Sequence, residues 1–152
     1  MNNFFTNNIG AFYPIDTNGN KAAYFNFQAL PSQAQVTFNI SVMAYNPHTP
    51  YQFHLTVYKD NYNKGNLIVD MYVTTNPGSI KINPINSIEN GLNSTNFSLT
   101  TPLFPIASGT HTYEAHIDLL DMQGKKLDEN KTWFLTRQQQ SQSLSAPDGG
   151  LN

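Results

Sequence analysis

The chain has 152 residues, a formal net charge of -2 and no Cys, and these three facts restrict what it can be. A chain of this length fits one domain and can bury roughly 70% of the surface that its unfolded form exposes, so it needs no disulfide or metal to fold. The absence of Cys excludes thiolate catalysis and Cys-based zinc sites. The eight Lys and Arg residues are scattered, which argues against nucleic acid and membrane surfaces as partners, because both require clustered cations.

The residues before Lys21 indicate where the protein is expected to work. They contain no Lys or Arg and no apolar run long enough for a secretory signal. No stretch of the chain reaches the ~18 apolar residues of a membrane-spanning helix. We therefore expect a cytoplasmic protein, or an extracellular one if the natural chain begins upstream of Met1.

Alternating apolar and polar residues predict β-strands along most of the chain, since every second side chain of a half-buried strand faces the core. In chain order, strands are expected at residues 22–29, 36–45, 51–59, 67–74, 93–100, 110–121 and 131–136, and residues 9–15 admit an eighth. No segment shows a sustained helical period. Seven to eight short strands predict an all-β fold, a two-sheet antiparallel sandwich.

Composition divides the chain into three parts. Residues 1–21 form an N-terminal arm that contains the additional strand, and residues 22–136 form the sandwich. Residues 137–152, RQQQSQSLSAPDGGLN, are polar and without periodicity, so we expect a disordered tail.

The phase of each strand predicts which side chains reach the core. In 110–121, the apolar residues at alternate positions are assigned inward, beginning with Tyr113. In the last strand, Trp133 and Leu135 are assigned to the core and Phe134 to the surface. Tyr45, at the end of 36–45, is also assigned outward by simple alternation.

The end of the chain, GTHTYEAHIDLLDMQGKKLDENKTWFLTR, resembles the corner and final hairpin of an immunoglobulin-like or fibronectin type III sandwich. In that family a Gly followed by an aromatic closes a corner before the next-to-last strand, and Gly109 and Tyr113 stand in that place. The Cys pair of the family is absent, and the one Trp, Trp133, lies on the final strand. The chain is also similar to stand-alone bacterial immunoglobulin-like domains of unknown function, which implies a fold and a cytoplasmic setting but no activity.

If strands 51–59, 67–74, 110–121 and 131–136 share one sheet, their outward residues form a single surface. The candidate interaction face on this surface consists of His54, Tyr58, Ile68, Asp70, Tyr72, Glu114, His116, Asp118 and Phe134. Exposed Tyr and Phe favour an interaction site, because an aromatic ring contributes a large area with few torsions to freeze. Tyr62, in the turn after 51–59, belongs to the same set of exposed aromatics.

Two imidazoles and a carboxylate from adjacent strands of this face can in principle bind a metal ion. Strands 51–59 and 110–121 are expected to be neighbours, with His54 facing His116 or Glu114. No H-x-H or HExxH spacing supports the site, so we predict no metal and no other cofactor. His111 is assigned to the corner as a structural, hydrogen-bonded histidine.

The sequence favours a non-enzymatic function. It contains no G-x-S-x-G and no Gly-rich phosphate loop, and its carboxylates are expected on an open sheet face, where pKa shifts are small. The main hypothesis is a protein-interaction module that binds another protein or itself through this face, with strands 67–74 and 131–136 as edges open to strand addition. One alternative is a carbohydrate-binding module, since Asn, Gln and Tyr stack on and hydrogen-bond to sugars. Another is a structural component of a phage or cell surface.

Overall fold

The computed structural model describes residues 5–77, 87–88 and 91–139. Within them ten β-strands and one short 3-10 turn follow one another along the chain. The strands are β1 (Asn8–Ile15), β2 (Tyr24–Phe27), β3 (Ser32–Ala34), β4 (Thr37–Tyr45), β5 (Gln52–Lys59), β6 (Leu67–Thr74), β7 (Asn93–Thr100), β8 (Phe104–Ile106), β9 (His111–Leu120) and β10 (Lys126–Gln138). The turn η1 (Lys64–Asn66) precedes β6. No helix in this described part is long and apolar enough to cross a membrane.

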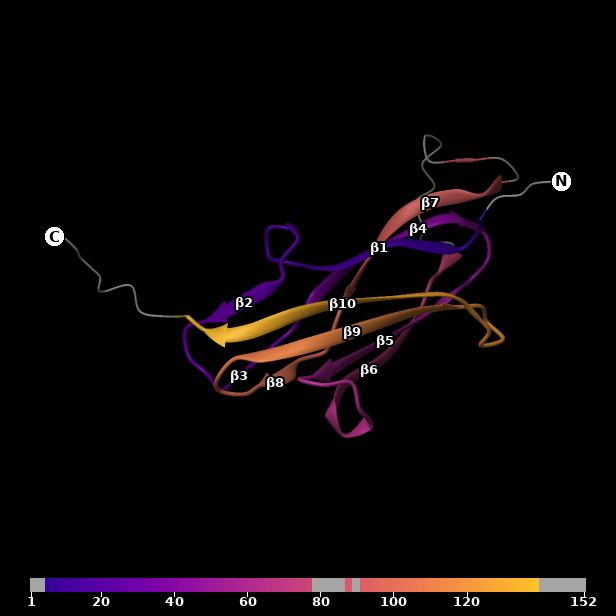
Figure 1. Ribbon diagram of the computed structural model, residues 1–152. Helices are drawn as coiled ribbons and strands as arrows, with labels where there is room; N and C mark the ends of the chain where they lie inside the picture. Colours follow the sequence, from indigo (N-terminus) through magenta and orange to yellow (C-terminus); the bar gives the residue numbers. More distant parts are fainter. Residues whose placement is uncertain (1–4, 78–86, 89–90, 140–152) are drawn as a thin grey trace.

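The strands form two main sheets and one small one. The larger sheet has the order β2-β10-β9-β5-β6, the second has the order β1-β4-β7, and β3 pairs with β8 apart from both (Figure 1). All pairs are antiparallel except β2 with β10, which run parallel. The predicted all-β sandwich of antiparallel sheets is confirmed, and each of the eight predicted ranges overlaps a strand.

Two features of the sheets differ from the sequence prediction. The short strands β3 and β8 had no clear alternation, because each has only three residues. Strand β10 is paired on both sides, with β9 and with β2, so it is not the free edge that the sequence suggested. The predicted tail at 137–152 lies mostly outside the described residues, although β10 itself continues to Gln138.

The core lies between the two main sheets and follows the alternation of the sequence. In β5 the side chains of Phe53, Leu55 and Val57 are almost completely buried, and their neighbours along the strand are not. The same pattern holds in β4 and in β9, where Tyr113, Ala115, Ile117 and Leu119 are buried as predicted. Each large apolar side chain buried in this way contributes about 1.5–3 kcal/mol relative to an exposed one.

The phase of β10 is the reverse of the prediction. Phe134 is buried, whereas Trp133 has 54% of its surface exposed. The reason is the register with β9, which places Phe134 opposite the buried Tyr113 and Trp133 opposite Glu114. Directly opposed residues of an antiparallel pair point to the same face of the sheet. The Tyr113 and Phe134 rings stack with centroids 4.7 Å apart, so Phe134 is a core residue and not part of a surface.

Bulges correct two further assignments. The register of β4 shifts between Val42 and Tyr45, where Ala44 adopts a left-handed φ of 57°, and Tyr45 is consequently buried. The register of β6 shifts opposite Val57 and Tyr58, so Ile68 is partly buried and packs against the core instead of standing on the surface. A bulge adds one residue to a strand and thereby reverses the faces beyond it, which simple alternation does not detect.

Candidate functional site

The outward-facing side of the five-stranded sheet, called here the outer face, holds seven of the nine residues of the predicted interaction face. They are His54, Tyr58, Asp70, Tyr72, Glu114, His116 and Asp118. Phe134 and Ile68 are the two that the fold directs to the core. The outer face divides into two groups of contacting side chains, one around His54 and one around Glu114.

The first group surrounds His54. Its ring stacks on the ring of Tyr72 with centroids 4.0 Å apart and an angle of only 2° between the planes. The Nε2 atom of His54 is 2.6 Å from an oxygen of Asp70, and its Nδ1 atom is 3.9 Å from an oxygen of Asp118. Tyr72 remains 57% exposed, so a rigid and largely accessible aromatic ring stands at this end of the face.

The register between β5 and β9 determines where the two histidines of the outer face lie relative to each other. Strands β5 and β9 are neighbours, as expected, but His54 pairs with Asp118 and Thr56 pairs with His116. His54 and His116 are therefore not opposite each other: His116 lies two residues along β9 from Asp118, the partner of His54. The two histidines belong to different groups. Among the residues that the structure describes, no set of three or more His, Asp or Glu side chains has the arrangement of a metal site.

The second group is a chain of contacts that centres on Glu114. Its Oε2 atom accepts a 2.6 Å hydrogen bond from Nε2 of His116, and its Oε1 atom accepts a 2.9 Å bond from the indole Nε1 of Trp133. The ring of Tyr62 stacks on His116 at 4.6 Å and contacts the edge of Tyr58 at 4.5 Å. Trp133 was not expected here, because its place depends on the register of β10 on β9, which the local sequence pattern does not contain.

The electrostatics of this group follow from its hydrogen bonds. The bond from His116 lowers the pKa of Glu114 below its ordinary value, with a further contribution from Trp133 and the charge of Lys131, against a smaller opposing effect of burial. Burial, together with the neighbouring Tyr62, raises the pKa of Tyr58. Glu114 is therefore an ionised hydrogen-bond acceptor at neutral pH.

The turn after β5 is held against the start of β9 by one carboxylate. Asp60 has a left-handed φ of 67°, and its two oxygens accept bonds from the backbone N–H of Thr112 and from Nδ1 of His111. Burial alone would raise the pKa of Asp60, but the bonds from His111 and Thr112 outweigh it and lower the pKa. The other ring nitrogen of His111 lies 2.8 Å from the carbonyl oxygen of Ser108, so His111 is the hydrogen-bonded structural residue that the sequence predicted.

Comparison with known proteins supports the fold. No protein-family model matches the chain, and no curated protein matches it in sequence. Among solved structures it resembles an adhesin from Mobiluncus mulieris that contains disulfide, isopeptide and ester cross-links, with a TM-score of 0.60 and 7% identity over 88% of this chain and 58% of that one. It also resembles a glycosyl hydrolase family 2 member from Bacteroides cellulosilyticus, with a TM-score of 0.54 and 10% identity over 84% of this chain and 15% of that one.

A CooA pilin subunit from enterotoxigenic Escherichia coli is similar at a TM-score of 0.39 and 6% identity, over 82% of this chain and 95% of the pilin. That score is too low to support an argument. The chain spans little more than half of the adhesin chain and a small part of the hydrolase. Identities of this size indicate a shared fold alone, and a sandwich of this type is compatible with a non-enzymatic structural or interaction domain.

Proposed function

We propose that the protein is a non-enzymatic interaction module that binds another protein through the β5–β6 end of its outer face. The observation that carries the proposal is the exposed ring of Tyr72, which is fixed in place by its stack on His54. A ring that is already immobile loses little entropy on binding, and Tyr is one of the residues that contribute most to protein interfaces. Asp70 and Asp118 beside it provide polar groups for the rim of such a contact.

The position of β6 at the edge of the sheet also favours the β5–β6 end of the outer face as the binding site. β6 is the last strand in the order β2-β10-β9-β5-β6 and pairs only with β5 among the described strands. Its sequence, LIVDMYVT, contains one charged residue and neither Lys nor Pro, the residues that commonly protect an edge. A partner could therefore contact Tyr72 and also add a strand along β6.

The carboxylates of the outer face support a function without catalysis. A general acid requires a carboxyl group whose pKa is raised, whereas the pKa values of Glu114 and Asp60 are both lowered. In the described part of the chain, His116 bonds to Glu114 but to no Ser or Thr hydroxyl that could serve as a nucleophile. These groups are arranged as hydrogen-bonded supports of a surface.

A photo-crosslinking experiment tests the proposal directly. A photoreactive phenylalanine analogue is placed at Thr74, an exposed position on β6, and at Ser98, an exposed position on β7 of the other sheet. We expect a crosslinked partner from position 74 and none from position 98. The Tyr72→Ala change should weaken binding of the purified partner about tenfold, whereas Met43→Ala on the β4 surface should not.

A second copy of the chain is one partner that this experiment can reveal. Adducts of twice the chain mass from position 74, with a concentration-dependent mass in light scattering, would identify self-association. Equal adducts from positions 74 and 98, or binding that is unchanged by Tyr72→Ala, would contradict the proposal.

A further inference from the structure

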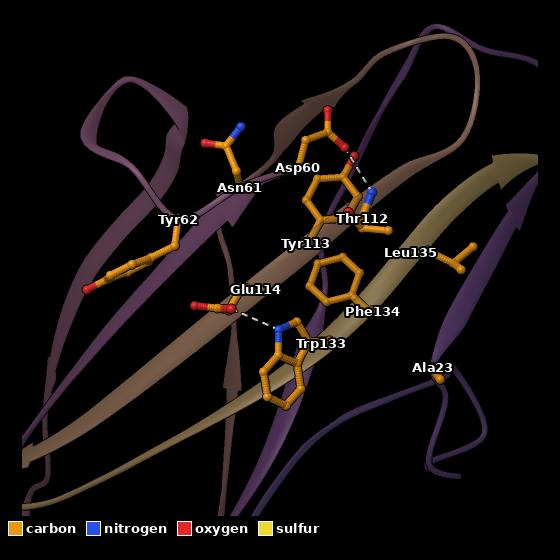
Figure 2. A pocket seen from close by; sticks show the side chains of 10 residues that line it. All are labelled: Ala23, Asp60, Asn61, Tyr62, Thr112, Tyr113, Glu114, Trp133, Phe134 and Leu135. Carbon is orange, nitrogen blue, oxygen red and sulfur yellow. Dashed lines mark hydrogen bonds between the residues drawn. The ribbon is translucent and has the colours of Figure 1, made fainter.

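A groove lies at the other end of the outer face, across β9 and β10. Its volume is about 460 Å³, which falls within the range of roughly 300–1,000 Å³ that small-molecule sites occupy. Figure 2 shows the residues that line it, with the Glu114 carboxylate between the rings of Tyr62 and Trp133. This groove, called here the Trp133–Tyr62 groove, is separate from the Tyr72 surface proposed above to bind a protein.

The two aromatic walls of the groove are exposed but held in position. Trp133 is 54% exposed and Tyr62 is 61% exposed. The indole of Trp133 is fixed by its bond to Glu114, and the ring of Tyr62 is fixed by its stack on His116. Trp133 projects from β10 and Tyr62 from the turn after β5, and each ring contacts a side chain of β9, the strand between them. Neighbouring strands of a sheet lie roughly 4.8 Å apart, so the two rings are only a short distance from each other. The groove between them therefore suits a narrow ligand with flat apolar faces.

The polar groups of the groove are mainly hydrogen-bond acceptors. Each carboxylate oxygen of Glu114 accepts one bond and has a second lone pair available. The carboxylate of Asp60, the amide of Asn61 and the hydroxyl of Thr112 lie along the same groove. No Lys or Arg is among the described residues that line it, so nothing in it favours an anion. A ligand with several hydroxyl donors matches this set.

A cationic side chain is a weaker match, because the positions that would attract it already have cations nearby. The ammonium of Lys131 lies 5.6 Å from the centroid of the Trp133 ring, and its charge also acts on Glu114. Asp60 is bonded to His111 and lies near the charge of Lys59. These cations reduce the attraction for a further positive charge and leave the uncharged faces of the rings and the acceptor lone pairs unaffected.

We propose that the Trp133–Tyr62 groove binds a neutral sugar. The C–H face of a pyranose ring stacks on the indole of Trp133, and its hydroxyl groups donate to Glu114 and Asp60. Tyr62 closes the opposite side of the groove. The site is a function additional to protein binding, because none of these residues belongs to the group around Tyr72 and His54.

The single Trp of the chain makes the test specific. Any change in tryptophan emission, and any shift of the one indole N–H resonance, reports on Trp133 itself. The full chain is titrated with neutral mono- and disaccharides of glucose, mannose, galactose, xylose and N-acetylglucosamine, and with the capped peptide acetyl-Gly-Lys-Gly-amide. At least one sugar should produce a saturable change with a Kd of roughly 1 mM or tighter, and the peptide should not.

Variants then assign the binding to the groove. Tyr62→Ala retains the Trp133 reporter and should weaken sugar binding about tenfold, and Trp133→Leu, measured by calorimetry, should abolish it. Tyr72→Ala is the matched control, a Tyr of similar exposure on the same face, and should leave the sugar affinity unchanged. Lys131→Met should also leave it unchanged, whereas a cationic ligand would bind more tightly to that variant.

The proposal is overturned if no sugar of the panel shifts the indole resonance, if the lysine peptide binds in preference to the sugars, or if Tyr62→Ala binds sugar as the unmodified chain does. A failure of sugar binding would not affect the crosslinking from position 74, and a failure of that crosslinking would not affect the titration. The protein-binding proposal and the sugar-binding proposal are therefore tested independently.

Discussion

Phe134 and Trp133 are adjacent in β10 and should respond in opposite ways to truncation. Phe134 is 3% exposed and contacts three rings, those of Tyr113, Phe38 and Phe25, with centroids 4.7, 6.0 and 5.8 Å away. Removing a buried Phe side chain costs its transfer free energy and leaves a cavity, together about 3–5 kcal/mol. We therefore expect Phe134→Ala to lower the free energy of unfolding by about 4 kcal/mol.

The same change at Trp133 should cost much less, because the ring is half exposed. Trp133→Ala loses the hydrogen bond to Glu114, the contact with Lys131 and some buried apolar surface. We expect these losses to lower the free energy of unfolding by about 1–2 kcal/mol. For a chain of this size, each kcal/mol corresponds to about 2–4 °C in Tm. The two variants should therefore differ by roughly 5–10 °C.

Urea unfolding followed by far-UV circular dichroism measures both variants without relying on tryptophan emission. If Phe134→Ala does not fold, Phe134→Leu keeps most of the volume and should cost about 1.5 kcal/mol. A comparable conservative change at the neighbouring position, Trp133→Phe, should lower the free energy of unfolding by less than Phe134→Leu does. A larger loss of stability from Trp133→Ala than from Phe134→Ala would refute the register of β10 on β9.

Three further predictions concern individual residues. The pKa of Glu114 in the folded protein lies below its ordinary value of 4.5. Its charge therefore stabilises the fold above that value, and this stabilisation is lost as the pH falls through the folded pKa. In urea melts, Glu114→Gln should lose less stability than the unmodified chain between about pH 5 and pH 3. Asp60 has a left-handed φ, so Asp60→Ala should be less stable than Asp60→Gly by about 1 kcal/mol in the same assay, and equal values would contradict a strained turn. Thr136→Val removes the 3.0 Å partner of the buried Tyr113 hydroxyl and should cost about 1–3 kcal/mol, whereas Thr132→Val, four residues earlier on the same strand, should cost less.

Much of the candidate site followed from local alternation. His54, Tyr58 and Tyr72 were placed correctly on the outer face, because an uninterrupted strand turns every second side chain to the same side. The neighbouring positions of β5 and β9 were also predicted. What alternation does not contain is the register between strands, so the pairing of His54 with Asp118 instead of His116 became clear only in the folded sheet.

The sequence by itself determined that this protein is an all-β sandwich, because alternation over seven to eight short segments gives each strand one apolar face, and packed sheets bury such faces against one another. The tertiary structure alone decided the identity of the groove. In β10 both faces carry apolar side chains, so composition allowed either phase, and only the pairing of Phe134 with the buried Tyr113 turned Trp133 outward. The turn at Asp60 then brought Tyr62 to the opposite side of Glu114, a contact between segments about fifty residues apart that no local pattern encodes.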